Sequence, residues 1–301
     1  MNMNIIEKRV WFLGISGILV LLSIAAIAVF GFRLGIDLKG GAQWEISVSG
    51  VSDENLILAA IKEVGNKDAS VKKSGEGTFF VRLPDITEEE HQQYFVELTK
   101  RFGTVEEKNF SSIGPAIGSE LRTKSMWAIA FVLLGISLYV AWAFRKVSRP
   151  IKSWKYGIAT LLSLFHDVVI PAGMLAMLGY FMGVEIDTNS IVALLVVMGF
   201  SVHDTIVVFD RIRENIIVMR GKTFSLGEII NKSVNETIVR SVNTSLTLII
   251  ILVALLIFGP PSLFYFVLTI LVGTLFGTYS SIFVASPLLY VWERIGAKST
   301  G

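Results

Sequence analysis

Two aspartates lie inside apolar stretches of this chain, and their surroundings make them the residues best suited to chemistry. Asp204 follows His203 in the apolar run of residues 190–209, and Asp167 follows His166 in the run of residues 156–182. An ionised carboxylate within hydrocarbon costs about 3 kcal/mol unless it is neutralised or partnered. The sequence therefore predicts that these residues handle protons or ions within a membrane.

Polar residues at helical spacing accompany both aspartates and begin a third apolar run. The three sets are Ser163, His166 and Asp167; Ser201, Asp204 and Thr205; and Arg240, Asn243, Thr244 and Thr247. Residues three and four apart share one face of a helix. We expect Asp167, Asp204 and Arg240 to meet at one depth, with the arginine balancing one or two carboxylates. Burial favours a neutral carboxyl and a nearby cation favours a charged one, so such a cluster can hold a proton and release it.

Each residue also has a structural interpretation. Asp204 and Asp167 can serve as hydrogen-bonding groups between packed helices. His166 and His203 can be donors between helices, and Arg240 can be a basic anchor at the start of a helix. At this stage the alternatives stay open for all five residues.

The elements that position these residues are predicted membrane helices. Hydrophobic residues make up 52% of the chain and charged residues only 17%, against about 25% charged in soluble domains. Six runs are near the roughly 20 residues that cross a bilayer. They are residues 10–30, 126–144, 156–182, 188–209, 241–258 and 263–292. We interpret the first as a retained anchor because its apolar run is too long for a signal-peptide core.

Basic residues predict the orientation. Five Lys or Arg and no acid lie within residues 145–155, and six Lys or Arg lie within residues 210–240. The positive-inside rule places both loops and both termini in the cytoplasm. Three parts follow: residues 1–32 (terminus and first helix), residues 33–124 (an outside domain) and residues 125–301 (the remaining five helices).

The outside segment has the pattern of an independent α+β domain. Alternation predicts strands at residues 43–49, 69–73, 78–83 and 104–110. A helix at residues 53–64 with Ser52 as N-cap and a helix from Thr87 to Arg101, with a Thr87–Glu90 capping box, complete a β-α-β-β-α-β order. This order is typical of ferredoxin-like domains. The fold-class prediction is therefore a polytopic α-helical membrane protein with one extracytoplasmic ferredoxin-like domain.

Several other patterns limit the function. The chain has no cysteine, which excludes disulfides and thiolate catalysis. It has no Gly-x-x-x-x-Gly-Lys-Ser/Thr motif for nucleotide phosphates. We predict no cofactor, no metal, no nucleic-acid partner and no enzymatic reaction. Gly273 and Gly277 predict close helix packing, and residues 210–214 predict an interfacial charge network.

Four motifs give the chain a resemblance to a known family. They are Gly-Ile-Asp-Leu-Lys-Gly-Gly at residues 35–41, Gly-Pro-Ala-Ile-Gly-Ser-Glu-Leu at 114–121, His-Asp-Val at 166–168 and the run Asp-Thr-Ile-Val-Val-Phe-Asp-Arg-Ile-Arg-Glu-Asn at 204–215. In this order they resemble the SecF branch of the SecD/SecF family, within the resistance-nodulation-division superfamily. One departure is His203, where the family usually has Asn.

The resemblance implies a function. Members assist preprotein translocation through SecYEG in the bacterial inner membrane, drawing on the proton-motive force. SecD is the implied partner, with unfolded preprotein outside, and YajC and YidC are further candidate partners. The family's intramembrane aspartate falls on Asp204 and its fifth-helix arginine on Arg240. Two other function classes stay open: a half-transporter for a small molecule or lipid, and a passive subunit that holds a translocase together.

Overall fold

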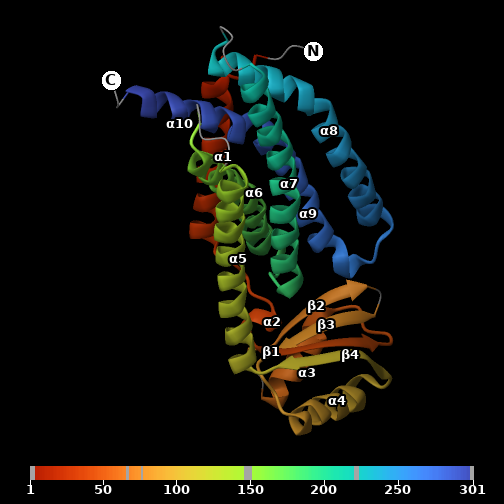
Figure 1. Ribbon diagram of the computed structural model, residues 1–301. Helices are drawn as coiled ribbons and strands as arrows, with labels where there is room; N and C mark the ends of the chain where they lie inside the picture. The colour runs from red at the N-terminus through yellow and green to blue at the C-terminus, as the bar shows by residue number, and fades with distance from the viewer. Residues whose placement is uncertain (1–3, 66–67, 76, 146–150, 220–223, 299–301) are drawn as a thin grey trace. The chain divides into compact units, whose positions relative to one another are not determined.

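The computed structural model describes residues 4–65, 68–75, 77–145, 151–219 and 224–298. The chain divides into two compact units (Figure 1). The smaller comprises Leu34–Met126, and the larger comprises Met1–Arg33 with Trp127–Gly301.

The smaller unit is a four-stranded antiparallel sheet with helices from the same segment. Its elements are α2 (Ile36–Lys39), β1 (Gly41–Val48), α3 (Glu54–Val64), β2 (Ser70–Gly75), β3 (Thr78–Leu83), α4 (Glu88–Phe102) and β4 (Val105–Ile113). The strand order is β2-β3-β1-β4. On the central strand, Trp44 pairs with Val81 of β3 and Phe110 of β4. This order and the β-α-β-β-α-β sequence confirm the ferredoxin-like prediction.

The core of this unit lies between the sheet and helices α3 and α4. Trp44, Phe79 and Ile57 are completely buried in it. The predicted capping box starts α4: Glu90 N donates to Thr87 Oγ1 at 3.3 Å and Thr87 N donates to Glu90 Oε2 at 2.8 Å. The predicted Ser52 cap is wrong. Asp53 caps α3, because its carboxylate accepts the Asn55 N–H at 2.9 Å.

Two of the glycine motifs meet in this unit. Gly40 has a φ of +85°, and a Cβ on it would lie 2.6 Å from Pro115 Cα. A Cβ on Gly118 would lie 2.5 Å from Gly40 N. Only glycine allows both the left-handed backbone and this approach. Residues 35–41 and 114–121, far apart in sequence, therefore form one tight joint.

The larger unit is a helical bundle that confirms the six predicted membrane helices. Its elements are α1 (Arg9–Phe30), α5 (Pro115–Ala143) from Trp127 onward, α6 (Ser153–Met182), α7 (Thr188–Val218), α8 (Leu226–Phe258), η1 (Pro261–Leu263), α9 (Phe264–Ser280), the π-helical turn η2 (Ser281–Ala285) and α10 (Ser286–Lys298). Within the described residues, six helical spans are long and apolar enough to cross a membrane.

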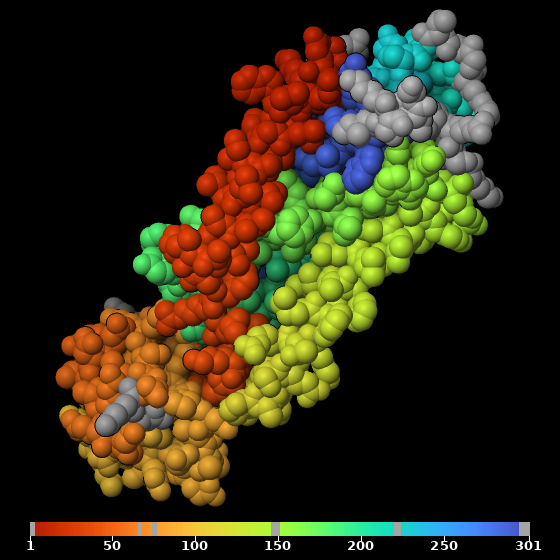
Figure 2. Space-filling view, turned by 90° about the vertical axis from the view of Figure 1, so that its left-hand side faces the viewer, coloured from red at the N-terminus to blue at the C-terminus, as the bar shows by residue number. Residues whose placement is uncertain are grey.

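Burial differs strongly among these helices. Helix α6 is central: 67% of its most apolar 18-residue stretch is buried, against 11% of the corresponding stretches of α1 and α5. Figure 2 shows α1 in red and α5 in yellow-green on the surface of the bundle. Helices α7 and α8 extend well beyond the predicted spans of residues 188–209 and 241–258, because polar helical turns continue the apolar ones. A Ser225–Glu228 capping box starts α8. Most of the predicted loop of residues 210–240 is therefore helix.

Candidate functional site

Asp167 of α6 is completely buried and satisfied by hydrogen bonds. Its Oδ1 lies 2.8 Å from His166 Nδ1, and its Oδ2 accepts hydrogen bonds from Ser280 Oγ at 2.7 Å and from Ser201 Oγ. Ser163 Oγ donates to Ser280 Oγ at 3.0 Å. One carboxylate thus ties α6, α7 and α9 together.

The approach of α9 to α7 depends on two glycines. A Cβ on Gly273 would lie 2.2 Å from Val197 Cγ2, and one on Gly277 would lie 3.0 Å from Ser201 Cβ. Any larger side chain would separate the helices that carry Ser201 and Ser280. The Gly273–Gly277 packing prediction is confirmed.

Asp204 of α7 is also buried, with 2% of its surface exposed, but its partners differ from those of Asp167. Ser241 of α8 lies beside its carboxyl. Among the described residues, Asp204 Oδ2, Thr205 Oγ1 and Ser241 Oγ are buried without a well-aligned hydrogen-bond partner. Buried polar atoms are nearly always satisfied. Asp204 therefore occupies a site with hydrogen-bonding capacity to spare, whereas Asp167 does not.

Arg240 does not join the two aspartates, contrary to the expected cluster. Its side chain is exposed on the surface of the chain, and no ion pair to it is found within the described part of the chain. Helix α8 buries the face that carries Ser241 and Ser245. Arg240 precedes Ser241 by one residue, about 100° around the helix. It therefore shares an exposed polar face with Asn243, Thr244 and Thr247.

The two histidines also differ in position. His166 is 3% exposed and lies against the rings of Tyr279 and Phe276, with centroids 6.2 Å away in each case. His203 is exposed on α7, on the same helical face as Val192, Val196 and Gly199. The structure thus brings His166 to Asp167 and leaves His203 on the surface next to Asp204.

A charge network links the polar ends of α7 and α8, as predicted for residues 210–214. Arg211 pairs with Glu236 at 2.7 Å and with Glu214 at 2.6 Å. Asn215 Nδ2 donates to Ser233 Oγ at 2.9 Å and to Glu236 Oε2 at 2.7 Å. Arg213 lies 3.5 Å from Asp210. Glu236 is a partner that the sequence reasoning missed.

Ser280 and Ser241 were missed as well. Each is a serine within an apolar run, and that was the only feature of the sequence that could have indicated a polar contact. Serines are common in membrane helices as packing residues, so the signal does not identify a partner. Only the helix arrangement shows that Ser280 faces Asp167 and Ser241 faces Asp204.

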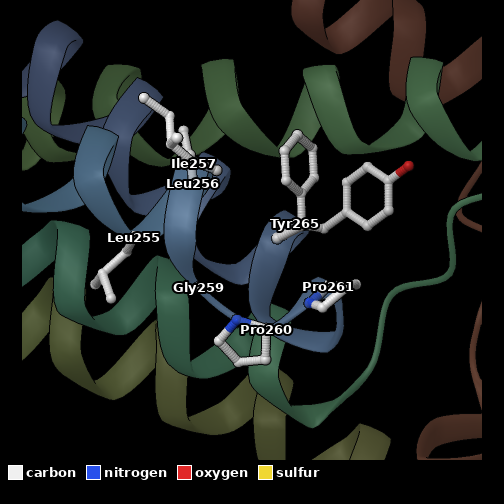
Figure 3. Close-up of a pocket in the computed structure, with 8 residues that line it drawn as sticks. Leu255, Leu256, Ile257, Gly259, Pro260, Pro261 and Tyr265 are labelled. Atoms are coloured by element: carbon white, nitrogen blue, oxygen red, sulfur yellow. The ribbon is translucent and has the colours of Figure 1, made fainter.

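A separate pocket of about 420 Å³ lies at the turn between α8 and α9 (Figure 3). Leu255, Pro260 and Tyr265 are among its lining residues, and none of the candidate residues lines it. Within the described residues, no group of three or more His, Asp or Glu is placed to hold a metal ion. Asp167 and Asp204, which lie in a bundle of membrane-length helices, therefore remain the candidate functional residues.

The chain matches two models of known protein families. A family model for the C-terminal part of the protein export membrane proteins SecD and SecF matches residues 94–295, and a model of the SecD/SecF GG motif matches residues 25–49. The chain belongs to the SecD/SecF family. Among its SecF relatives, the protein translocase subunit SecF of Thermobaculum terrenum is 44% identical, over 97% of this chain and 94% of that protein.

Fused relatives add a structural match. The translocase subunit SecDF of Thermus thermophilus is 35% identical over 97% of this chain, which spans only 40% of that protein. The crystal structure of a Thermus SecDF, described as a translocon-associated membrane protein, matches with a TM-score of 0.82 at 33% identity, over 98% of this chain and 39% of that one. A SecDF structure in a "Super-membrane-facing form" matches with a TM-score of 0.71 at 32% identity, over 100% and 40% of the two chains. The SecD/SecF fold of this chain is thus established on both sequence and structure.

Proposed function

We propose that this chain is the SecF-type half of a proton-driven protein-export factor, without hydrolytic chemistry of its own. In this proposal it lies in a bacterial inner membrane with both termini in the cytoplasm. It pairs with a SecD-type chain and assists preproteins that emerge from SecYEG. The observation that carries the proposal is the contrast between two buried carboxylates: Asp167 is held by three neighbours, whereas Asp204 Oδ2 has none among the described residues.

The contrast assigns different roles to the two aspartates. A carboxylate that accepts several hydrogen bonds is stabilised in its charged form and is a poor proton carrier. Asp204 Oδ2 has no well-aligned donor among the described residues, so adding a proton to that oxygen breaks no existing hydrogen bond. We assign Asp204 as the proton carrier, with Asp167 and His166 as positioning groups that hold α7 in place.

Pairing with a SecD-type partner is supported by the exposed polar face of α8. Arg240, Asn243, Thr244 and Thr247 lie within a membrane-length helix, yet face away from this chain's own bundle. A charged side chain turned toward lipid costs about 3 kcal/mol. A partner with a facing carboxylate would remove that cost. The relative named SecDF is a longer chain, of which this chain spans 40%.

The energy available is sufficient for mechanical work. One charge that moves through the membrane field yields about 2.3 kcal/mol per 100 mV. A few kcal/mol shifts a two-state arrangement strongly toward one state. Proton passage at Asp204 would thereby drive the domain of Leu34–Met126 between states that hold and release an emerging chain.

The test is an Asp204→Asn variant of the complex with its SecD-type partner, reconstituted in vesicles. We expect loss of pH-driven ion flux and of the gain in preprotein export that depends on the proton-motive force. The matched control is Asp210→Asn, on the same helix but exposed and 3.5 Å from Arg213, which should retain both. Full export by Asp204→Asn would contradict the proposal and favour a passive assembly subunit. Flux that needs an added small molecule would favour a half-transporter.

A further inference from the structure

A row of hydroxyl groups leads away from Asp204 along the interface of α7, α8 and α9. Ser241 lies beside the aspartate, and one turn further along α8 is Ser245. Thr278 Oγ1 of α9 lies 2.5 Å from Ser245 Oγ. One turn further along α9 is Thr274, which is completely buried. The row thus crosses from one helix to the next at the Ser245–Thr278 contact.

The packing of α7 against α9 fixes the depth of these groups. Gly273 faces Val197 and Gly277 faces Ser201, so the two helices run in parallel with matched levels. Thr278 then lies near the level of Val202, and Thr274 lies a turn further from Asp204. The row therefore runs from Asp204 toward the end of the bundle where Gly259 and Pro260 join α8 to α9.

Three oxygens of this row have bonding capacity that the protein does not fill. Asp204 Oδ2, Ser241 Oγ and Thr274 Oγ1 are buried without a partner among the described residues. Ser241 and Ser245 of α8, and Thr278 and Thr274 of α9, lie on successive turns of their helices, about 5–6 Å apart. One water molecule with two hydrogen bonds of about 2.8 Å spans that distance. Buried waters occupy sites of this kind, where several polar groups lack protein partners.

An apolar cluster ends the row. Ala193 of α7, Leu252 of α8, and Val267 and Ile270 of α9 are packed together and buried. Ile270 lies one turn beyond Thr274 and Ala193 one turn beyond Val197. Apolar constrictions of this kind block water and can open by wetting. Hydroxyl groups thus lie on the Asp204 side of the cluster and the α8–α9 turn on the other.

We propose that Ser241, Ser245, Thr278 and Thr274 bind a file of water molecules that carries protons to Asp204, and that the Leu252–Ile270 cluster is its gate. The inference rests on the proposed function and names the access route within this chain. Each water accepts a proton on its oxygen and releases another to the next. The last transfer forms an O–H bond at Asp204 Oδ2 and neutralises the carboxylate. A hydronium ion on the far side of the gate supplies the proton.

The first test removes hydroxyls without changing volume. In vesicles that contain the complex with its SecD-type partner, Thr278→Val should lower Asp204-dependent proton flux roughly tenfold, as expected for loss of one hydrogen bond from the rate-limiting transfer. Thr278→Ser, which keeps the hydroxyl, should restore it. Thr160→Val is the control for the loss of a hydroxyl elsewhere: Thr160 is buried, and its hydroxyl donates to the Tyr156 carbonyl at 2.9 Å, away from the row.

The second test opens the gate. Leu252→Ser should raise proton leak, and the added leak should disappear in the Leu252→Ser, Thr278→Val double variant. If Thr278→Val and Ser241→Ala both leave flux unchanged while Asp204→Asn abolishes it, this route is overturned and the proposed function stands. If Asp204→Asn itself leaves flux unchanged, the proposed function fails first. The melting temperature of each variant complex shows whether the variant is still folded. A loss of flux at an unchanged melting temperature is then due to the proton route.

Discussion

Ser280 of α9 donates a hydrogen bond of 2.7 Å to the Asp167 carboxylate of α6, and the same serine accepts one of 3.0 Å from Ser163. Ser201 of α7 donates to the same carboxylate oxygen. Helices α6, α7 and α9 therefore share one buried carboxyl group. In the proposed function, Asp167 holds α7 in place through Ser201. Asp204, three residues beyond Ser201, can then gain and lose a proton.

Replacing Asp167 should affect stability more than any exposed acid. Asp167→Ala leaves His166, Ser201 and Ser280 without their acceptor, and such losses cost about 2–4 kcal/mol. A shift of roughly 2–4 °C per kcal/mol is expected in the melting temperature of the purified protein. Asp210→Ala, at an exposed site, should change it by less than about 0.5 kcal/mol. Equal melting temperatures for the two variants would show that the network contributes nothing.

The joint between the two glycine motifs predicts a second effect. In Gly40→Ala the new Cβ would lie 2.6 Å from Pro115 Cα, a backbone atom that cannot move aside. Gly50→Ala is the matched control, since its φ is also positive, at +78°, but nothing lies within 4 Å of the added Cβ. The control should lose only the left-handed backbone term, about 1–2 kcal/mol. We expect faster protease cleavage within Leu34–Met126 for Gly40→Ala than for Gly50→Ala. Similar cleavage rates for the two variants would show that the contact between Gly40 and Pro115 does not stabilise this unit.

The contact between Gly273 of α9 and Val197 of α7 predicts a third effect, which a second substitution should compensate. In Gly273→Ala the added Cβ would lie 2.2 Å from Val197 Cγ2, and the β-branched valine has little rotamer freedom to avoid it. Overpacking of this kind costs about 1–3 kcal/mol. Val197→Ala removes the clashing methyls, so the double variant should melt above Gly273→Ala alone. Gly135→Ala, with nothing within 4 Å, should be neutral. Additive effects of Gly273→Ala and Val197→Ala would disprove the contact.

The sequence was sufficient for the local features and insufficient for those that depend on helix rotation. Thr87 and Glu90 lie three residues apart, so their capping box was readable without any tertiary information. Asp167 and Asp204 stood out because carboxylates are rare in apolar runs. The side of α8 that faces inward was misjudged, because Arg240 and Ser241 are adjacent and one residue of rotation exchanges buried for exposed. No residue pattern within one helix fixes that angle, which is set by packing between α8 and α9.

A buried ion pair gives the last prediction. Lys155 Nζ of α6 lies 2.6 Å from Glu293 Oε2 of α10, with 7% and 22% of the two side chains exposed, and Trp154 packs edge-on against Trp292 beside it. Removing one partner leaves an uncompensated charge, so Glu293→Leu alone should cost about 2–4 kcal/mol. Replacing both with apolar residues of similar size often restores stability. The Lys155→Met, Glu293→Leu double variant should therefore melt close to the parent. A double variant as unstable as the sum of the single ones would show that the pair is held by its surroundings and not by mutual attraction.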